Sequence, residues 1–232
     1  MQKFFLISIV FFIIPTHKVF AQYKLLDKSF QDSLYNVIPN VSRSQKVNIY
    51  LKLAQLIWDT LPQKAFIDLE HALRLSIVEN NDSLKAYTRA VMGDYFVKRC
   101  KYLQAQEHYI AAIKIYQRIR NTEGEIKVLA QIGELNRMLE TYDEALDYFQ
   151  KGLKLAQNIN NLRMAGEFHN QMAITFQAMG DLKNARVSFT NSLDSFRKAG
   201  DKSGEFYVIN NIGSILLDQN RFDSALSYYQ KI

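Results

Sequence analysis

The chain has 232 residues, of which 48% are hydrophobic and 22% charged, with only 3 Pro and 9 Gly. This composition is typical of a folded protein and excludes collagen-like and intrinsically disordered chains. The 29 basic residues exceed the 23 acidic ones, which gives a net charge of +6. The basic side chains are spread among acidic ones, so we expect no nucleic-acid-binding patch. Cys100 is the single cysteine and cannot form an internal disulfide.

The first 21 residues have the organisation of a secretory signal peptide. Lys3 supplies a positive charge, an apolar run follows from Phe4 to Ile14, and Val19-Phe20-Ala21 provides a cleavage site. The run has about eleven residues, whereas a bilayer span needs roughly 20. The alternatives are an uncleaved anchor or a core helix. We expect that residues 1–21 are removed and that the mature protein is periplasmic or extracellular.

Helical periodicity extends from about residue 24 to the end of the chain. It predicts a leading helix at 24–37, which ends before Pro39. Thr122 with Glu125, and Thr141 with Glu144, have the spacing of capping boxes. Antiparallel pairs of helices are predicted to follow the leading helix, at 44–58 with 62–78, 82–99 with 102–119, 122–139 with 142–158, 162–179 with 182–198, and 202–219 with 222–232.

A repeat of forty residues runs through this helical region, and such a period indicates a solenoid. Its central column is an alanine, at Ala65, Ala105, Ala145, Ala185 and Ala225. Twelve residues before the last four of these alanines stands another small residue, at Gly93, Gly133, Ala173 and Gly213. Four residues after each alanine stands a bulky apolar residue, at Leu69, Tyr109, Phe149, Phe189 and Tyr229. Three residues further on, the residue is small again in Ala72, Ala112, Gly152 and Ser192.

These columns have a packing interpretation. Two antiparallel helices approach closely where both side chains are small, so we expect Gly93 to face Ala105 and Gly133 to face Ala145. The bulky residues of each second helix are expected to fill the core between successive pairs, and burial of each ring contributes roughly 1.5–3 kcal/mol. This set comprises Tyr102, Tyr109, Tyr142, Phe149, Leu182, Phe189, Phe222 and Tyr229.

The spacing resembles that of the tetratricopeptide repeat. Met92-Gly93, Tyr102, Ala105, Tyr109 and Ala112 carry the resemblance in one repeat, and it covers about residues 44–232. The usual period of this repeat is about 34 residues, so this chain is similar to the forty-residue variant found in kinesin light chains and bacterial peptide-responsive regulators. The resemblance implies an all-α, right-handed α-solenoid, with a leading segment at 22–43 and five helix pairs at 44–232.

The leading segment resembles the start of exported bacterial modules of this family. In that group the repeats often precede a membrane helix and a histidine kinase, a nucleotide cyclase or a DNA-binding domain. Ile232 falls where Ala112, Gly152 and Ser192 stand in earlier repeats, so we expect the fifth pair to be truncated, because a solenoid needs a polar cap. The alternative is a natural end that pairs with a partner or a second copy.

The sequence contains no motif that predicts catalysis. It lacks a glycine-rich phosphate loop, a His-Glu-x-x-His motif and a Cys-x-x-Cys pair. His71, His108 and His169 stand at unrelated points of the repeat. We therefore expect no enzyme activity, no cofactor and no metal site.

The resemblance implies a binding groove on the concave face, which the first helix of each pair lines in this family. We expect a peptide or a helix of unknown identity to bind there, with asparagine amides contacting peptide backbone. In the alternative, these asparagines bond only within the helical array. The groove candidates are Tyr87, Asp94 and Lys98 in one repeat, Lys127, Glu134 and Arg137 in the next, then Asn170 and Gln177, and finally Tyr207, Asn210 and Asp218.

The sequence thus predicts a non-catalytic scaffold for protein–protein interaction. The alternative is the periplasmic sensor region of a larger membrane-bound signalling protein. Contact with a membrane is expected only through a segment beyond residue 232.

Overall fold

The structure is a computed structural model that describes residues 28–230, except for the side chain of Asp218. The predicted signal peptide at 1–21 lies outside the described residues. Lys231 and Ile232 also lie outside them, so the expected truncation of the fifth pair stays a prediction.

The described chain consists of helices joined by short loops. A leading helix covers residues 28–37 and continues into a 3₁₀ turn at Ile38–Asn40. Up to α10, the helices that follow begin and end within one residue of their predicted bounds. They are α2 (Arg43–Ile57), α3 (Pro62–Val78), α4 (Asp82–Lys98), α5 (Tyr102–Arg118), α6 (Thr122–Met138), α7 (Tyr142–Asn158), α8 (Leu162–Ala178), α9 (Leu182–Ala199), α10 (Lys202–Asp218) and α11 (Phe222–Tyr229).

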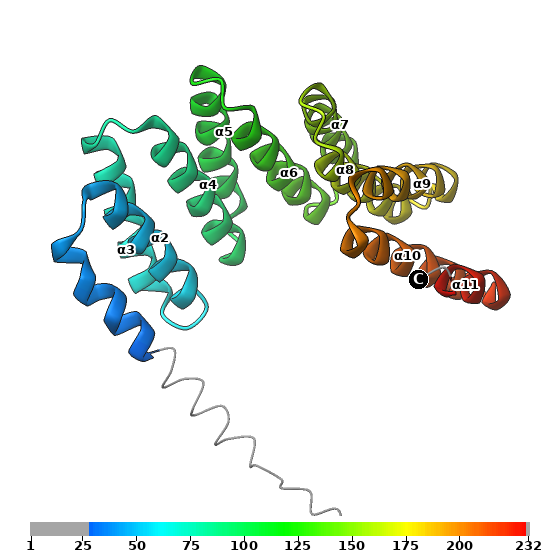
Figure 1. Cartoon of the computed structure of the whole chain (residues 1–232), viewed down its shortest axis with the longest axis horizontal. Coiled ribbons are helices and arrows are strands. Elements are labelled where there is room, and N and C mark those ends of the chain that lie inside the picture. The colour runs from blue at the N-terminus through cyan, green and yellow to red at the C-terminus, as the bar shows by residue number, and fades with distance from the viewer. Residues whose placement is uncertain (1–27, 231–232) are drawn as a thin grey trace, which may run out of the picture.

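Consecutive helices pack as antiparallel pairs, and the pairs stack into a right-handed solenoid that curves into an arc (Figure 1). The first helices of successive pairs also contact one another, from α2 to α4, α4 to α6, α6 to α8 and α8 to α10. Because these contacts bring the first helices together, α2, α4, α6, α8 and α10 form the inner layer of the arc. No helix in residues 28–230 is both long enough and apolar enough to span a membrane.

The forty-residue repeat is divided into two equal halves by its turns. A residue with positive φ follows a helix at every twentieth position, at Asn80, Cys100, Arg120, Glu140, Asn160, Gly180, Gly200 and Asn220. After α4, the Lys101 N–H donates to the Phe96 carbonyl at 2.9 Å, and the Cys100 N–H donates to the Val97 carbonyl at 2.9 Å. This is a Schellman closure, which satisfies the last carbonyls of the helix. Each helix with its loop therefore spans twenty residues.

Both predicted capping boxes are wrong. The Asn121 side chain, one residue before Thr122, accepts from the Gly124 N–H at 2.9 Å, so it already satisfies a free donor of α6. Thr141 does precede α7, but its hydroxyl points back and donates to the Asn136 carbonyl at 3.1 Å. The side chain of Asn121 therefore caps α6, and the side chain of Thr141 does not cap α7.

The core contact inside a pair joins a glycine to an aromatic ring. A Cβ at Gly93 would collide with the Tyr109 ring, and a Cβ at Gly133 would collide with the Phe149 ring. The expectation that these glycines face Ala105 and Ala145 did not include this ring, which is the nearest side chain to each glycine. The ring lies against the bare backbone of the first helix, and the alanine lies buried one turn away from the ring.

A second close contact joins one pair to the next. The small residue Gly152 of α7 lies under the Phe168 ring of α8. In the following repeat Ser192 stands at this position, and its hydroxyl donates to the Gly166 carbonyl at 2.7 Å. Phe149 and Phe168 themselves pack with ring centroids 6.4 Å apart. The small column after each aromatic residue therefore allows successive pairs to pack together.

Not every residue that was predicted to lie in the core is buried. Tyr109, Phe149 and Phe189 are at most 2% exposed, as expected. Leu182 and Phe222, however, are 45% and 62% exposed, so the prediction that they lie in the core is wrong. They are the first residues of α9 and α11.

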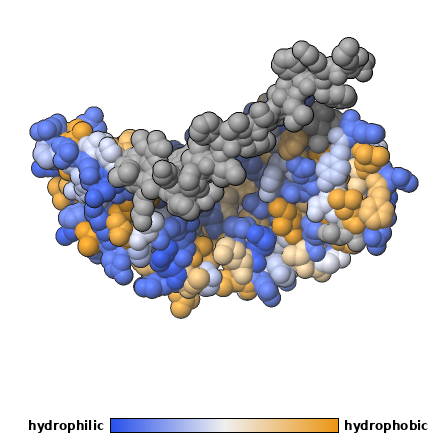
Figure 2. Space-filling view, turned by 90° about the horizontal axis from the view of Figure 1, so that it is seen from below, coloured by the Kyte–Doolittle hydropathy of each residue, from blue (hydrophilic) through white to orange (hydrophobic). Residues whose placement is uncertain are grey.

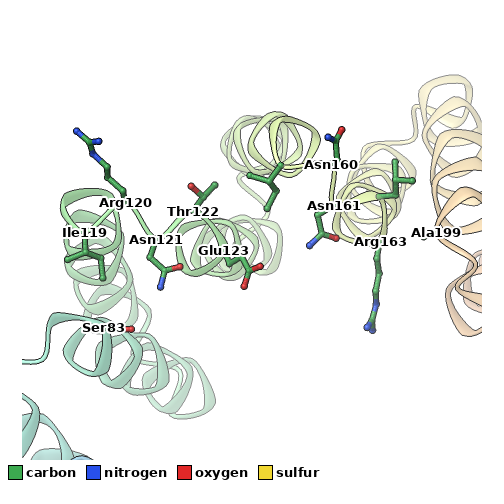
Figure 3. Close-up of a pocket in the computed structure, with 12 residues that line it drawn as sticks. Ser83, Ile119, Arg120, Asn121, Thr122, Glu123, Asn160, Asn161, Arg163 and Ala199 are labelled. Atoms are coloured by element: carbon green, nitrogen blue, oxygen red, sulfur yellow. The ribbon is translucent and has the colours of Figure 1, made fainter.

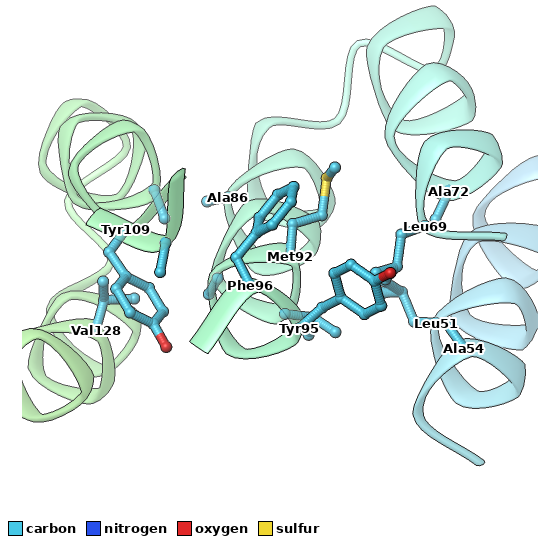
Figure 4. Packing of buried hydrophobic residues seen from close by; sticks show 14 of the residues in the cluster. Leu51, Ala54, Leu69, Ala72, Ala86, Met92, Tyr95, Phe96, Tyr109 and Val128 are labelled. Atoms are coloured by element: carbon cyan, nitrogen blue, oxygen red, sulfur yellow. The ribbon is translucent and has the colours of Figure 1, made fainter. Parts of the chain in front are cut away.

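The leading helix closes the N-terminal end of the core. The Tyr35 hydroxyl donates a hydrogen bond to Asp68 of α3 at 2.5 Å, and Asp68 is only 4% exposed. Burial is the main reason that the pKa of Asp68 is raised, and the hydrogen bond from Tyr35 opposes this shift. Behind this contact, the core runs continuously from Leu51 and Leu69 to the aromatic residues of the next pair (Figure 4).

The contact between Gly133 and Phe149 gives a stability prediction. Gly133→Ala should lower the free energy of unfolding by about 1–3 kcal/mol through overpacking, even though alanine favours a helix by about 1 kcal/mol. Urea denaturation followed by circular dichroism measures this change. In a Phe149→Leu background the same substitution should cost less, because the ring is gone; an equal loss in both backgrounds would contradict the proposed contact.

Candidate functional site

The inner layer of the solenoid carries a cavity of about 480 Å³ between the end of α2, α4 and α6. Three of the predicted groove residues, Asp94, Lys98 and Glu134, lie in it together. We call it the α4–α6 cavity, and its lining consists of Trp58, Asp94, Val97, Lys98, Tyr109, Ala130, Gln131, Glu134, Leu135 and Met138.

Asp94 is the polar centre of this cavity. Its Oδ1 accepts hydrogen bonds from the Tyr109 hydroxyl at 2.7 Å and from Gln131 Nε2 at 2.6 Å. Burial raises the pKa of Asp94, and the two hydrogen bonds oppose that shift. Asp94 therefore links both helices of its own pair to α6 of the next pair. The columns of small and bulky residues gave no sign of this link, although an amide recurs at this position in Gln131, Gln171 and Asn211.

The cationic end of Lys98 lies at the rim of the cavity. Its Nζ is 3.3 Å from Asp59 Oδ2 and 5.2 Å from the centroid of the Trp58 ring. Arg99 also pairs with Asp59, at 3.4 Å. Trp58 and Asp59 were not among the predicted residues. The sequence could have indicated Trp58 as a groove residue, because it stands forty residues before Lys98, at the same position of the repeat.

Glu134 and Arg137 neutralise each other on α6. Arg137 Nε donates to Glu134 Oε2 at 2.9 Å, and both side chains are partly buried. This hydrogen bond is the main reason that the pKa of Arg137 is raised above its ordinary value. The pair is therefore a fixed dipole on the inner layer, with little net charge to offer a ligand.

Three other predicted groove residues are exposed. Tyr87 on α4 is 45% exposed, Tyr207 on α10 is 54% exposed, and Lys127 on α6 is exposed. Gln177, near the end of α8, is partly buried. The side chain of Asp218 lies outside the described part of the chain. The structure thus brings Asp94, Lys98 and Glu134 into one cavity and places the remaining described candidates elsewhere on the first helices.

The two predicted asparagines have different surroundings. Asn170 is 4% exposed, and its Oδ1 accepts from Nδ2 of Asn211 at 3.0 Å, so it joins α8 to α10. Asn210 is partly exposed, and its amide has no hydrogen-bond partner among residues 28–230. Of the two, Asn210 is the one whose amide is available to a ligand. Asn170 acts within the helical array, which is the alternative that the sequence left open.

A larger recess, of about 880 Å³, lies along the loops that connect successive pairs (Figure 3). Asn161 and Arg163, two of its polar residues, serve the fold. Asn161 Oδ1 accepts from the Met164 N–H at 3.0 Å, and Arg163 pairs with Asp201 at 3.1 Å. The surface seen in Figure 2 mixes polar and apolar residues without a continuous patch of one kind.

The three histidines within residues 28–230 do not gather at one place. His71 stacks on Tyr50 with ring centroids 5.2 Å apart, whereas His108 packs on Phe96 at 5.2 Å. Burial lowers the pKa of His108 to about 4 and also lowers the pKa of His169. Within residues 28–230, no group of three or more His, Cys, Asp or Glu side chains could hold a metal ion.

Residues 84–158 and 165–232 match the family model described as tetratricopeptide repeat. The chain belongs to the tetratricopeptide repeat family. A curated relative is the Tonsoku-like protein of Drosophila melanogaster, which is 23% identical over 160 residues, or 60% of this chain. This chain spans only 11% of the length of that relative.

Several solved structures share the fold of the chain at low sequence identity. BtubC from P. vanneervenii has a TM-score of 0.73 at 14% identity, with 89% of this chain and 87% of that chain covered. A Rap protein complexed with competence and sporulation factor has a TM-score of 0.69 at 14% identity, with 88% and 57% covered. The tetratricopeptide-repeat signal transduction ATPase of Pyrococcus horikoshii has a TM-score of 0.69 at 17% identity, with 82% and 30% covered.

The contrast between Asn170 and Asn210 can be measured. Asn170→Ala should lower the free energy of unfolding by about 1–3 kcal/mol, because the amide of Asn211 loses its buried acceptor. Asn210→Ala, the matched control, should stay within about 0.5 kcal/mol of the parent protein. Chemical denaturation measures the free energy of unfolding of both variants. Equal stabilities would refute the conclusion that Asn170 serves the fold and Asn210 does not.

Proposed function

We propose that the protein is a non-catalytic interaction scaffold that binds an extended peptide or a helix along its inner layer. The observation that carries this proposal is the α4–α6 cavity, in which three groove candidates meet beside apolar side chains such as the exposed Met138. Repeat solenoids typically use such a concave surface for binding. Tyr87 and Tyr207 supply exposed aromatic surface, and tyrosine is enriched where proteins bind partners.

The distribution of charge supports recognition by shape and by many small contacts. Lys98 is held by Asp59, and Arg137 is held by Glu134, so two of the three cations among the groove candidates are already paired. Asn210 offers an amide that both donates and accepts, which suits the backbone of an extended peptide. A ligand would therefore bridge several repeats.

The comparisons agree with a peptide or protein ligand. One structural neighbour is a Rap protein in complex with competence and sporulation factor, and another is a Rap conjugation regulator in complex with the Phr* peptide. Both are 15% identical to this chain or less. Their likeness supports the fold, and peptide binding by this chain is our inference from the inner layer.

A second candidate function is the sensor region of a larger signalling protein. The neighbour from Pyrococcus horikoshii is described as a signal transduction ATPase with a tetratricopeptide repeat sensor, and this chain covers 30% of it. Peptide binding by the inner layer would serve as the input in that case. The two candidates therefore share one binding surface and differ in what is attached to it.

We further propose that the protein is exported through residues 1–21. The charged start, the apolar run and the small residue Ala21 support a cleaved signal peptide. The protein recovered from the periplasm or the medium should have the mass of residues 22–232. An intact chain of 27.0 kDa that stays in the cytoplasm would refute export.

Selection from a displayed library of random linear peptides tests the binding surface. The parent protein should enrich peptides that the variant Tyr207→Ala/Asn210→Ala binds at least about tenfold more weakly, since each lost groove contact contributes roughly 1–2 kcal/mol. Leu103→Ala is the matched control, because Leu103 is 79% exposed on α5, outside the inner layer. Failure to enrich any peptide, or equal binding by the parent and the groove variant, would contradict the proposed surface.

A further inference from the structure

We propose that the α4–α6 cavity is a specific pocket for a basic side chain, arginine or lysine, of the bound peptide, with Asp94 as its counter-ion. This inference rests on the proposed function, and it names the chemistry of one residue of the ligand. It follows from the way in which charges are paired around the cavity.

The cations near the cavity already have anionic partners. Lys98 and Arg99 both pair with Asp59, at 3.3 Å and 3.4 Å, and Arg137 pairs with Glu134. Asp94, in contrast, pairs with no cation in residues 28–230. Its two donors, Tyr109 and Gln131, are both neutral. The cavity therefore holds one carboxylate whose charge the fold does not balance.

The second carboxylate oxygen of Asp94 is the free end. Both hydrogen bonds reach Oδ1, so Oδ2 has no donor among the described residues. Among the described residues, Oδ2 is not one of the fully buried side-chain atoms that lack a hydrogen-bond partner. Asp94 also lines the cavity. Oδ2 is therefore accessible from the groove, and a guanidinium or ammonium group could donate to it.

The walls of the cavity suit the aliphatic stem of such a side chain. Trp58, Val97, Leu135 and Met138 surround the polar centre with apolar surface. A long basic side chain buries its methylene groups against apolar surface while its charged head reaches a carboxylate. A volume of about 480 Å³ lies within the usual range of side-chain and small-ligand pockets. An acidic guest would instead meet the uncompensated charge of Asp94.

The same peptide selection tests the pocket when it is repeated with Asp94→Asn. Asparagine keeps an oxygen for Tyr109 and Gln131 but removes the charge. Peptides enriched by the parent protein should carry arginine or lysine at a fixed position, and Asp94→Asn should lose that preference. Asp147→Asn, on the exposed face of α7, is the matched control and should keep it.

Individual peptides then give the magnitude of the effect. Trp58 is the only tryptophan in the chain and lines the cavity, so its fluorescence reports binding. Exchange of the fixed arginine for citrulline, or of the fixed lysine for glutamine, should weaken binding to the parent protein at least about tenfold, as loss of a charge-assisted hydrogen bond does. The same exchange should change binding to Asp94→Asn little.

The outcomes separate this inference from the proposed function. Enrichment of peptides without a fixed basic residue, including those with an apolar residue at that position, would overturn the basic pocket and leave groove binding intact. A basic preference that persists in Asp94→Asn would also overturn it. Enrichment of no peptide at all would remove the groove itself, and the pocket with it.

Discussion

The contact between an aromatic ring and a bare helix backbone is the constraint on which the solenoid depends. Tyr109 lies against Gly93, and Phe149 lies against Gly133, so in these two pairs the helices approach closely where no Cβ intervenes. A ring in this position is buried by both helices of its pair. It thereby supplies much of the apolar area that stabilises each pair.

Stacking of the pairs depends on a second small residue and on buried polar links. Gly152 accommodates Phe168 of the next pair. Asp94 joins Tyr109 to Gln131 of the next pair, and Asn170 joins Asn211. Because a buried polar group without a partner destabilises the fold, such links favour one register of stacking. Several inner-layer groups are therefore used by the fold and are not available for binding.

Binding at this surface, as we propose it, would use the polar groups that the fold leaves free. The amide of Asn210 and Oδ2 of Asp94 have no hydrogen-bond partner among the described residues. Lys98 and Arg137, in contrast, are paired with carboxylates. A ligand that satisfies both groups must cover more than one repeat, since Asp94 lies on α4 and Asn210 on α10. This geometry favours an elongated ligand over a small molecule.

The sequence by itself determined the helices and their order, because small and bulky residues recur at fixed intervals and helical packing requires those sizes. It also located Asp94 and Asn210, since the repeat assigns each position of a first helix to a face. Only the tertiary structure decided that Gly93 faces Tyr109 and that Phe222 is exposed. It alone separated Asn170 from Asn210 as well, because a hydrogen bond between residues forty-one positions apart depends on how the pairs stack, and no local spacing encodes it.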